Sequence, residues 1–215
     1  MAMTLYLDRP GRCLGRADGR GFDAEARRWL AGAAGAIGEP VELAAAVAWL
    51  QTESGRPCRV PVGVVGPRRA SADEAQVAER IGLGLAGLGL TVLCGGRQGV
   101  MEAVCRGVSG AGGISVGLLP DADPAAANAH VGIVIATGVG LARNAIIARA
   151  ALCLVAVGGG HGTTSEMALA LQFGTPVFGL CQAPAMAGVI ACDTPEAALD
   201  HVARTVLAIP LDESS

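Results

Sequence analysis

The feature that most constrains the fold is an alternation of short apolar runs and helical patterns that begins near Val60. The first run, 62–65, ends at a Gly-Pro pair, and an amphipathic helical pattern covers 72–88. Short apolar runs that alternate with helices are typical of βαβ units and a parallel sheet. We therefore predict an α/β fold: a Rossmann-like, doubly wound, mostly parallel sheet with helices on both faces. Strands are expected at 62–65, 90–94, 114–119, 131–136, 151–157, 176–180 and 188–191, and helices at 72–88, 100–108, 141–150, 167–172 and 195–207.

Residues 1–55 have a different pattern. Two short strands are expected at 4–8 and 13–18, and two short helices at 23–30 and 41–51. Trp29 and Trp49 are the expected apolar anchors of this segment. We interpret residues 1–55 as a small N-terminal extension packed on a main domain of residues 56–215.

The overall composition indicates a globular chain with a sizeable core and excludes several classes of partner. The chain has 215 residues, of which 52% are hydrophobic and 16% charged. Its net charge of −3 gives no electrostatic basis for general nucleic-acid binding, so we expect no nucleic-acid partner. No apolar run has the length of a membrane span, and the N-terminal segment lacks a signal-peptide core. We expect no membrane association and a cytoplasmic location.

The cysteines and histidines do not form a disulfide or metal pattern. The seven cysteines are odd in number and include no CxxC pair, and the three histidines share no metal-ligand spacing. Cys94, Cys153 and Cys181 lie in or at the ends of apolar runs, as small buried hydrophobic residues do. We predict no metal site.

The chain contains no lysine, because all sixteen basic residues are arginine. Enzymes that depend on pyridoxal phosphate need a lysine to form the Schiff base, and a Walker P-loop needs a lysine at the phosphates. Both classes are excluded, together with lysine-dependent aldolases.

A glycine-rich loop is the most informative functional motif. The segment Gly158-Gly-Gly-His-Gly-Thr-Thr-Ser-Glu166 joins the apolar run 151–157 to the helical pattern 167–172. Glycines allow a close backbone approach, and a helix start presents unpaired N–H groups to an anion. The loop therefore predicts a phosphate site, with Glu166 beside it. In the alternative interpretation, Thr163 and Glu166 form a capping box and the loop is only a connection.

Two further loops follow predicted strands, at 66–69 and 95–99. The carboxyl ends of parallel strands meet at one edge of a sheet, so we expect all three loops to surround one ligand. No GxGxxG follows the first strand of the main domain, which argues against a dinucleotide cofactor. The candidate phosphate- and ligand-binding residues are Gly66, Arg68, Gly95, Gly96, Arg97, Gly99, Met101, Gly159, Gly160, Gly162, Thr163 and Thr164.

Three motifs together resemble those of the Lonely Guy superfamily, whose members also carry a lysine decarboxylase label. They are Cys94-Gly-Gly-Arg-Gln-Gly-Val-Met-Glu102, Gly140-Leu-Ala-Arg-Asn144 and the glycine-rich loop. The resemblance implies that Arg143 and Glu166 are the catalytic pair of an N-glycosidic hydrolase that releases a base from a nucleoside 5′-monophosphate. It also implies a homodimer or larger homo-oligomer, for which helices 145–150 and 167–172 offer apolar surface.

This chain departs from the hydrolase motif at two positions, where Gly158 replaces a proline and Asn144 a lysine. At both positions the sequence resembles the branch of the superfamily that contains molybdenum-cofactor carrier proteins. We therefore expect a protein that binds a phosphorylated small molecule, with no required cofactor and with the molybdenum cofactor as a candidate cargo. A phosphoribohydrolase is the alternative, and a regulatory nucleotide sensor is a third interpretation.

Overall fold

The computed structural model describes residues 4–32 and 38–211, and the chain divides into two compact units. One unit combines residues 1–58 with 200–215, and the other comprises residues 59–199. The sequence predicted a boundary at residue 55 and placed residues 200–215 in the main domain, whereas the contacts of residues 200–211 group them with the N-terminal unit. Residues 1–3 and 33–37 of the predicted extension, and 212–215 of the predicted main domain, lie outside the described residues.

The larger unit contains a seven-stranded sheet in the order β12-β11-β10-β6-β7-β8-β9, and its neighbouring strands are all parallel. The strands are β6 (Val62–Val65), β7 (Val92–Cys94), β8 (Ser115–Leu119), β9 (Ile133–Ala136), β10 (Leu154–Val157), β11 (Val177–Leu180) and β12 (Val189–Ala191). The chain runs outward from β6 to β9, returns to β10 beside β6, and then runs outward the other way. The predicted doubly wound α/β fold is confirmed.

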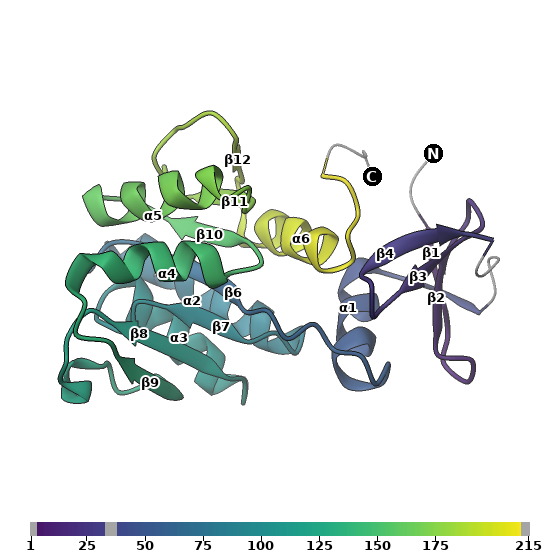
Figure 1. The fold of residues 1–215 in the computed structure, drawn as a ribbon, viewed down its shortest axis with the longest axis horizontal. Coiled ribbons are helices and arrows are strands. Elements are labelled where there is room, and N and C mark those ends of the chain that lie inside the picture. Colours follow the sequence, from purple (N-terminus) through teal and green to yellow (C-terminus); the bar gives the residue numbers. More distant parts are fainter. Residues whose placement is uncertain (1–3, 33–37, 212–215) are drawn as a thin grey trace. The chain divides into compact units, whose positions relative to one another are not determined.

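Helices cover both faces of this sheet, as predicted (Figure 1). Crossovers between parallel strands are right-handed. The helices that connect strands from β6 towards β9 therefore lie on one face of the sheet, and those that connect strands from β9 back towards β12 lie on the other. Helices α2 and α3 therefore share a face, and α4 and α5 share the opposite face. The bounds are α2 Ala72–Gly87, α3 Val100–Gly110, α4 Arg143–Ala150, α5 His161–Gln172 and α6 Pro195–Val206, with short 3-10 turns η1 Pro124–Ala126 and η2 Gly140–Ala142.

The caps of two helices explain where they begin. Ser71 and Glu74 form a capping box at the start of α2, with Glu74 N–H 3.2 Å from Ser71 Oγ and Ser71 N–H 2.7 Å from the Glu74 carboxylate. Thr194 Oγ1 accepts a hydrogen bond from Ala197 N–H at 3.2 Å, so Thr194 caps the start of α6.

The core of the larger unit lies on both faces of the central strands. All residues of β6, β10 and β11 are buried, as expected for strands covered on both faces. The edge strand β9 differs, because Ile133, Val134 and Ile135 are all exposed. Among the described residues, no helix combines the length and apolar character that crossing a membrane requires.

The smaller unit contains an antiparallel sheet in the order β4-β3-β2-β1-β5. Its elements are β1 Leu5–Asp8, β2 Cys13–Arg16, β3 Arg20–Asp23, β4 Arg28–Ala31, β5 Glu39–Val41 and α1 Leu43–Thr52. The two predicted strands and the second predicted helix are confirmed. The helix predicted at 23–30 is wrong, because this segment forms the turn and second strand of a β3–β4 hairpin.

The two tryptophans occupy different positions in the smaller unit. Trp49 is buried in its core, as predicted, with 3% of its surface exposed. Trp29 is half-buried, and its Nε1–H donates to the carbonyl of Leu207 at 2.7 Å. This bond helps to explain why residues 200–211 group with the N-terminal segment.

All seven cysteines lie within the described ranges and are free thiols. Cys94 and Cys153 are buried, whereas Cys181 is half-buried at a left-handed backbone position with φ 52°. The Sγ atoms of Cys94 and Cys105 lie 3.5 Å apart. This thiol–thiol contact raises the pKa of Cys94 and lowers the pKa of Cys105 to about 7.

Candidate functional site

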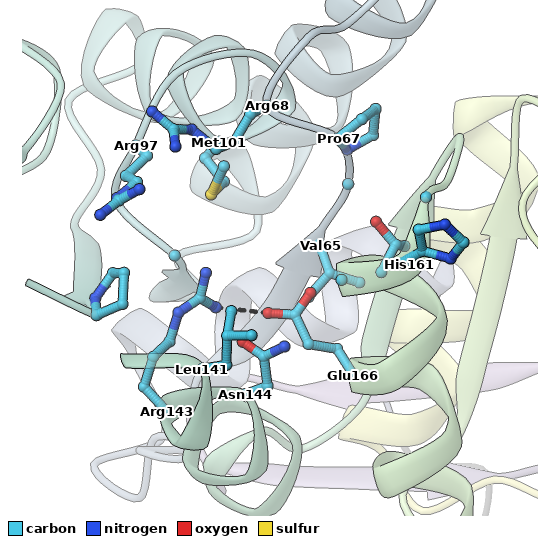
Figure 2. Close-up of a pocket in the computed structure, with 16 residues that line it drawn as sticks. Val65, Pro67, Arg68, Arg97, Met101, Leu141, Arg143, Asn144, His161 and Glu166 are labelled. Atoms are coloured by element: carbon cyan, nitrogen blue, oxygen red, sulfur yellow. Dashed lines mark hydrogen bonds and ion pairs between the residues drawn. The ribbon is translucent and has the colours of Figure 1, made fainter. Parts of the chain in front are cut away.

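A cavity of about 360 Å³ lies at the carboxyl ends of the central strands, where the strand order reverses between β6 and β10 (Figure 2). Ligands of open α/β sheets bind at such a switch point, because the loops that follow the two strands diverge there. The walls come from the loops after β6, β7 and β8, from η2 and the start of α4, and from the start of α5.

Most of the predicted site residues line this cavity. Those that line it are Gly66, Arg68, Gly95, Arg97, Met101, Arg143, Gly160, Gly162, Thr163 and Glu166. Four predicted residues do not: Gly96, Gly99, Gly159 and Thr164. The Thr164 hydroxyl instead bonds to the carbonyl of Gly160 at 3.0 Å. Gly99 has a left-handed φ of 74° at the start of α3, where a side chain would collide with the backbone of Pro67 and Arg68.

The three consecutive glycines have different roles. Gly158 has a φ of 61°, which proline cannot adopt, and a side chain there would collide with the Glu74 carboxylate. A side chain on Gly159 would collide with the ring of Pro184. A Cβ on Gly160 would meet nothing within 4 Å, although Gly160 lines the cavity. The first two glycines are therefore required by the fold, and the third leaves open space beside the cavity.

Helix α5 begins at His161, with Gly160 as its N-cap and no side-chain cap. The capping-box interpretation is therefore wrong, because Thr163 lies inside the helix and Glu166 lies in its second turn rather than its first. The first turn contains no acidic residue, and its N–H groups have no intrahelical partner. Gly162, like Gly160, faces open space. The start of α5 thus presents bare N–H donors and the positive end of a helix dipole to the cavity.

Arg143 and Glu166 form a buried ion pair in the cavity wall. Arg143 Nη1 donates to Glu166 Oε1 at 2.5 Å, and the side chains are 11% and 7% exposed (Figure 2). Burial raises the pKa of Glu166, while the charge and hydrogen bond of Arg143 oppose this rise without cancelling it. The two residues come from different helices, α4 and α5, so the ion pair also joins two walls of the cavity.

The raised pKa of Glu166 gives a testable dependence of stability on pH. The folded state holds this proton more tightly than the unfolded state, so the free energy of unfolding should fall as pH rises from about 4.5 through the folded pKa. Urea titrations at several pH values should show wild type losing stability relative to Glu166→Gln across this window. A difference between the two proteins that does not change with pH would contradict the burial argument.

The other cavity arginines lie at the rim and are less buried. Arg97 bonds to the Asp121 carboxylate, with Nε 2.8 Å from Oδ2, and this contact lowers the pKa of Asp121. Arg68 is exposed, and among the described residues its one hydrogen-bond partner is the neutral Gln98, at 3.3 Å. Arg69 is exposed and does not line the cavity. Of the rim arginines in the described chain, Arg68 is therefore the one whose charge no bonded carboxylate neutralises.

Six residues outside the predicted set also line the cavity. They are Val65, Pro67, Pro120, Leu141, Asn144 and His161. Asn144 had been noted only as a departure from a motif and His161 only as a loop residue. Pro120 directly follows β8, and Pro67 follows β6 after one glycine. Their position at the ends of strands was the sequence signal that could have identified them. Within the described parts of the chain, no group of three or more histidines, cysteines or carboxylates is placed to hold a metal ion.

Comparisons with known proteins agree with this architecture. An uncharacterised protein of Archaeoglobus fulgidus is 37% identical over 140 residues, which are 65% of this chain and 92% of that protein. The molybdenum cofactor binding protein of Rippkaea orientalis is 33% identical, with a TM-score of 0.64 over 67% of this chain and 96% of that one. The molybdenum-cofactor carrier protein of Chlamydomonas reinhardtii is also 33% identical, with a TM-score of 0.63 over 70% of this chain and all of that one (100%).

A family model covers most of the chain. The SLOG cluster4 model matches residues 59–205, which include the whole cavity and its three motif loops. Together with the carrier-protein structures, this match confirms the resemblance inferred from the motifs. The chain belongs to the SLOG cluster4 family.

Proposed function

We propose that this protein binds a phosphorylated small molecule in the switch-point cavity and acts as a binding or carrier protein. The observation that carries the proposal is the bare start of α5, where Gly160 and Gly162 leave open space at the cavity wall. Backbone N–H groups at a helix start bind phosphate through hydrogen bonds and the helix dipole. Arg68 adds a positive charge at the rim.

The nature of the cavity residues favours a ligand held by its phosphate and by an organic ring. Among the described lining residues there is no cysteine, and His161 is the one histidine. If the cargo is the molybdenum cofactor, as for the similar carrier proteins, the protein would hold its phosphate and pterin rather than its metal. Five lining residues offer apolar surface for a flat ring: Val65, Pro67, Met101, Pro120 and Leu141.

The carboxylate content favours binding over hydrolysis. Glycosidic hydrolysis by protein groups usually uses two carboxylates that flank the scissile bond. In the described part of the cavity wall, Glu166 is the one carboxylate, and it is already paired with Arg143. The hydrolase alternative is favoured only by the correspondence of this pair to the catalytic pair of the Lonely Guy hydrolases.

Thermal shift and product analysis test the proposal together. At a ligand concentration of about 100 Kd, binding adds about 2.7 kcal/mol to the free energy of unfolding, which for a chain of this size raises Tm by about 5–10 °C. We expect this rise with at least one of AMP, GMP and molybdopterin, and no release of free base from AMP or GMP. The absence of a shift with all three would contradict phosphate-ligand binding, and release of free base would replace the carrier with the hydrolase.

We also propose that the protein is a homo-oligomer that buries the edge of its large sheet. The apolar residues of the edge strand and of the segment after it are exposed: Ile133, Val134, Ile135, Val139, Leu141 and Ile146. Edge strands of this length and composition are normally covered or charged, and residues 131–142 contain no charged side chain. Light scattering should give at least twice 21.4 kDa, and Ile135→Lys should shift the mass towards the monomer. A monomeric wild type at micromolar concentration would contradict the proposal.

A further inference from the structure

Two asparagines of the larger unit are equally buried, but only one has its amide satisfied. Asn128 is 8% exposed, and its Nδ2 donates to the carbonyls of Gly96 at 3.1 Å and Arg97 at 2.8 Å. Its Oδ1 accepts from His130 N–H at 3.0 Å. Asn144 is 5% exposed and lines the cavity, yet within the described chain its Oδ1 has no hydrogen-bond partner.

The neighbour of Asn144 has a second unsatisfied atom. Arg143 directs Nη1 to Glu166, and its Nε is buried without a partner among the described residues. An acceptor and a donor on consecutive residues of α4 are therefore both unsatisfied at the same wall of the cavity. Unsatisfied buried polar atoms are rare and destabilising, so a pair of them at a cavity wall requires an explanation.

We propose that Asn144, together with Arg143, recognises the ring of the ligand through an edge that carries a hydrogen-bond donor beside an acceptor. This inference rests on the proposed function, which places the phosphate at the start of α5. A phosphate monoester offers mainly acceptors at neutral pH, so it cannot satisfy Asn144 Oδ1. Purines and pterins carry donor–acceptor edges, and amide side chains pair with such edges in a bidentate manner.

In the ligand-free protein, Asn144 Oδ1 and Arg143 Nε are not accessible to solvent. Both are buried beneath the cavity surface, so the Asn144 amide must turn towards the cavity when a ring enters. Binding would then relieve a destabilising feature of the free protein. Asn144 is accordingly a residue that determines specificity for the ring, and the fold itself does not require its amide.

Asn144→Leu tests this role, because leucine has a similar shape and no polar atoms. The ligand-free variant should melt about 2–6 °C higher than wild type, since the unsatisfied amide is gone. Its affinity for GMP or AMP, measured by calorimetry, should fall about 10- to 100-fold. Its affinity for ribose 5-phosphate, which has the phosphate but no ring, should stay within about twofold. The matched control Asn128→Leu should melt lower than wild type, because it removes three hydrogen bonds.

The other outcomes separate this inference from the proposed function. A lower Tm for ligand-free Asn144→Leu would show that the amide is structural and would overturn the inference. The inference would also be overturned if Asn144→Leu lost affinity for ribose 5-phosphate and GMP equally. The same holds if wild type bound GMP and AMP no more tightly than ribose 5-phosphate. Neither result would contradict the phosphate site. A wild type that binds none of the three probes would contradict the proposed function and this inference together.

Discussion

Replacing Gly160 with valine should weaken the binding of a phosphorylated ligand by about 100-fold or more while the protein stays folded. Gly160 has extended backbone angles, φ −159° and ψ −173°, which valine adopts readily. Its side chain would project into open space at the cavity wall and block the approach of a phosphate to the first N–H groups of α5. Hydrogen bonds to a charged group contribute about 1.5–3 kcal/mol each, so the loss of two accounts for the effect. Calorimetry with GMP and circular dichroism measure affinity and fold.

Two other glycines provide matched controls for this prediction. Gly87, at the end of α2, also faces open space but does not line the cavity, so Gly87→Ala should leave both affinity and fold unchanged. Gly159→Ala should lower stability, because its side chain would collide with Pro184. Unchanged affinity in Gly160→Val would show that the loop only connects β10 to α5.

Removing the Glu166 side chain should lower the free energy of unfolding by about 3–5 kcal/mol. Glu166→Ala leaves the Arg143 guanidinium buried without its counter-charge, which is more destabilising than the loss of the hydrogen bond alone. The double variant Arg143→Leu/Glu166→Met should recover most of this loss, because it removes both charges and keeps apolar volume. Urea titrations of the wild type, of Glu166→Ala and of the double variant measure both changes in the free energy of unfolding.

A loss below about 1 kcal/mol in Glu166→Ala would contradict the buried pair, since that is the range of exposed ion pairs. A different variant, Glu166→Gln, separates binding from catalysis. If the protein is a carrier, Glu166→Gln changes affinity but no turnover exists to be lost. If it is a hydrolase, turnover should fall about 10²-fold or more with little change in affinity, because one electrostatic stabiliser is lost.

The sheet of the larger unit could be predicted because its sequence signals are local and agree with one another. Buried parallel strands such as β6 and β10 are continuous apolar runs, and each ends at a glycine. The start of α5 was the exception, because Thr163 and Glu166 have the spacing of a capping box, although the helix begins at His161. The ion pair with Arg143 accounts for Glu166 at that position, and this contact joins two helices through residues 23 positions apart, which the local sequence does not reveal.

The hairpin of the smaller unit could not be predicted from local propensity. Residues 23–28 are rich in alanine, glutamate and arginine, which favour a helix. The structure instead pairs Phe22 with Trp29 across two strands, with their ring centroids 5.2 Å apart, and Arg27 adopts a left-handed φ of 50° in the turn. Cross-strand aromatic contacts stabilise strands through neighbours that the local sequence does not reveal.

The cavity was predicted through its loops and through Arg143, but the neighbours of Arg143 in the cavity wall were not predicted. The glycine-rich loops follow strands, so their position at the carboxyl edge could be inferred from topology. Leu141 and Asn144 lie in η2 and α4, and only the packing of α4 against the sheet brings them to the cavity. The unsatisfied amide of Asn144 likewise has no sequence signal, because satisfaction of a buried group depends on its three-dimensional neighbours.

A crystal structure of the protein with GMP or molybdopterin would show where the phosphate binds. We expect the phosphate within hydrogen-bond distance of the backbone N–H groups of His161, Gly162 and Thr163, with the ring on the side of Arg143 and Asn144. A phosphate bound elsewhere, with the start of α5 empty, would contradict it.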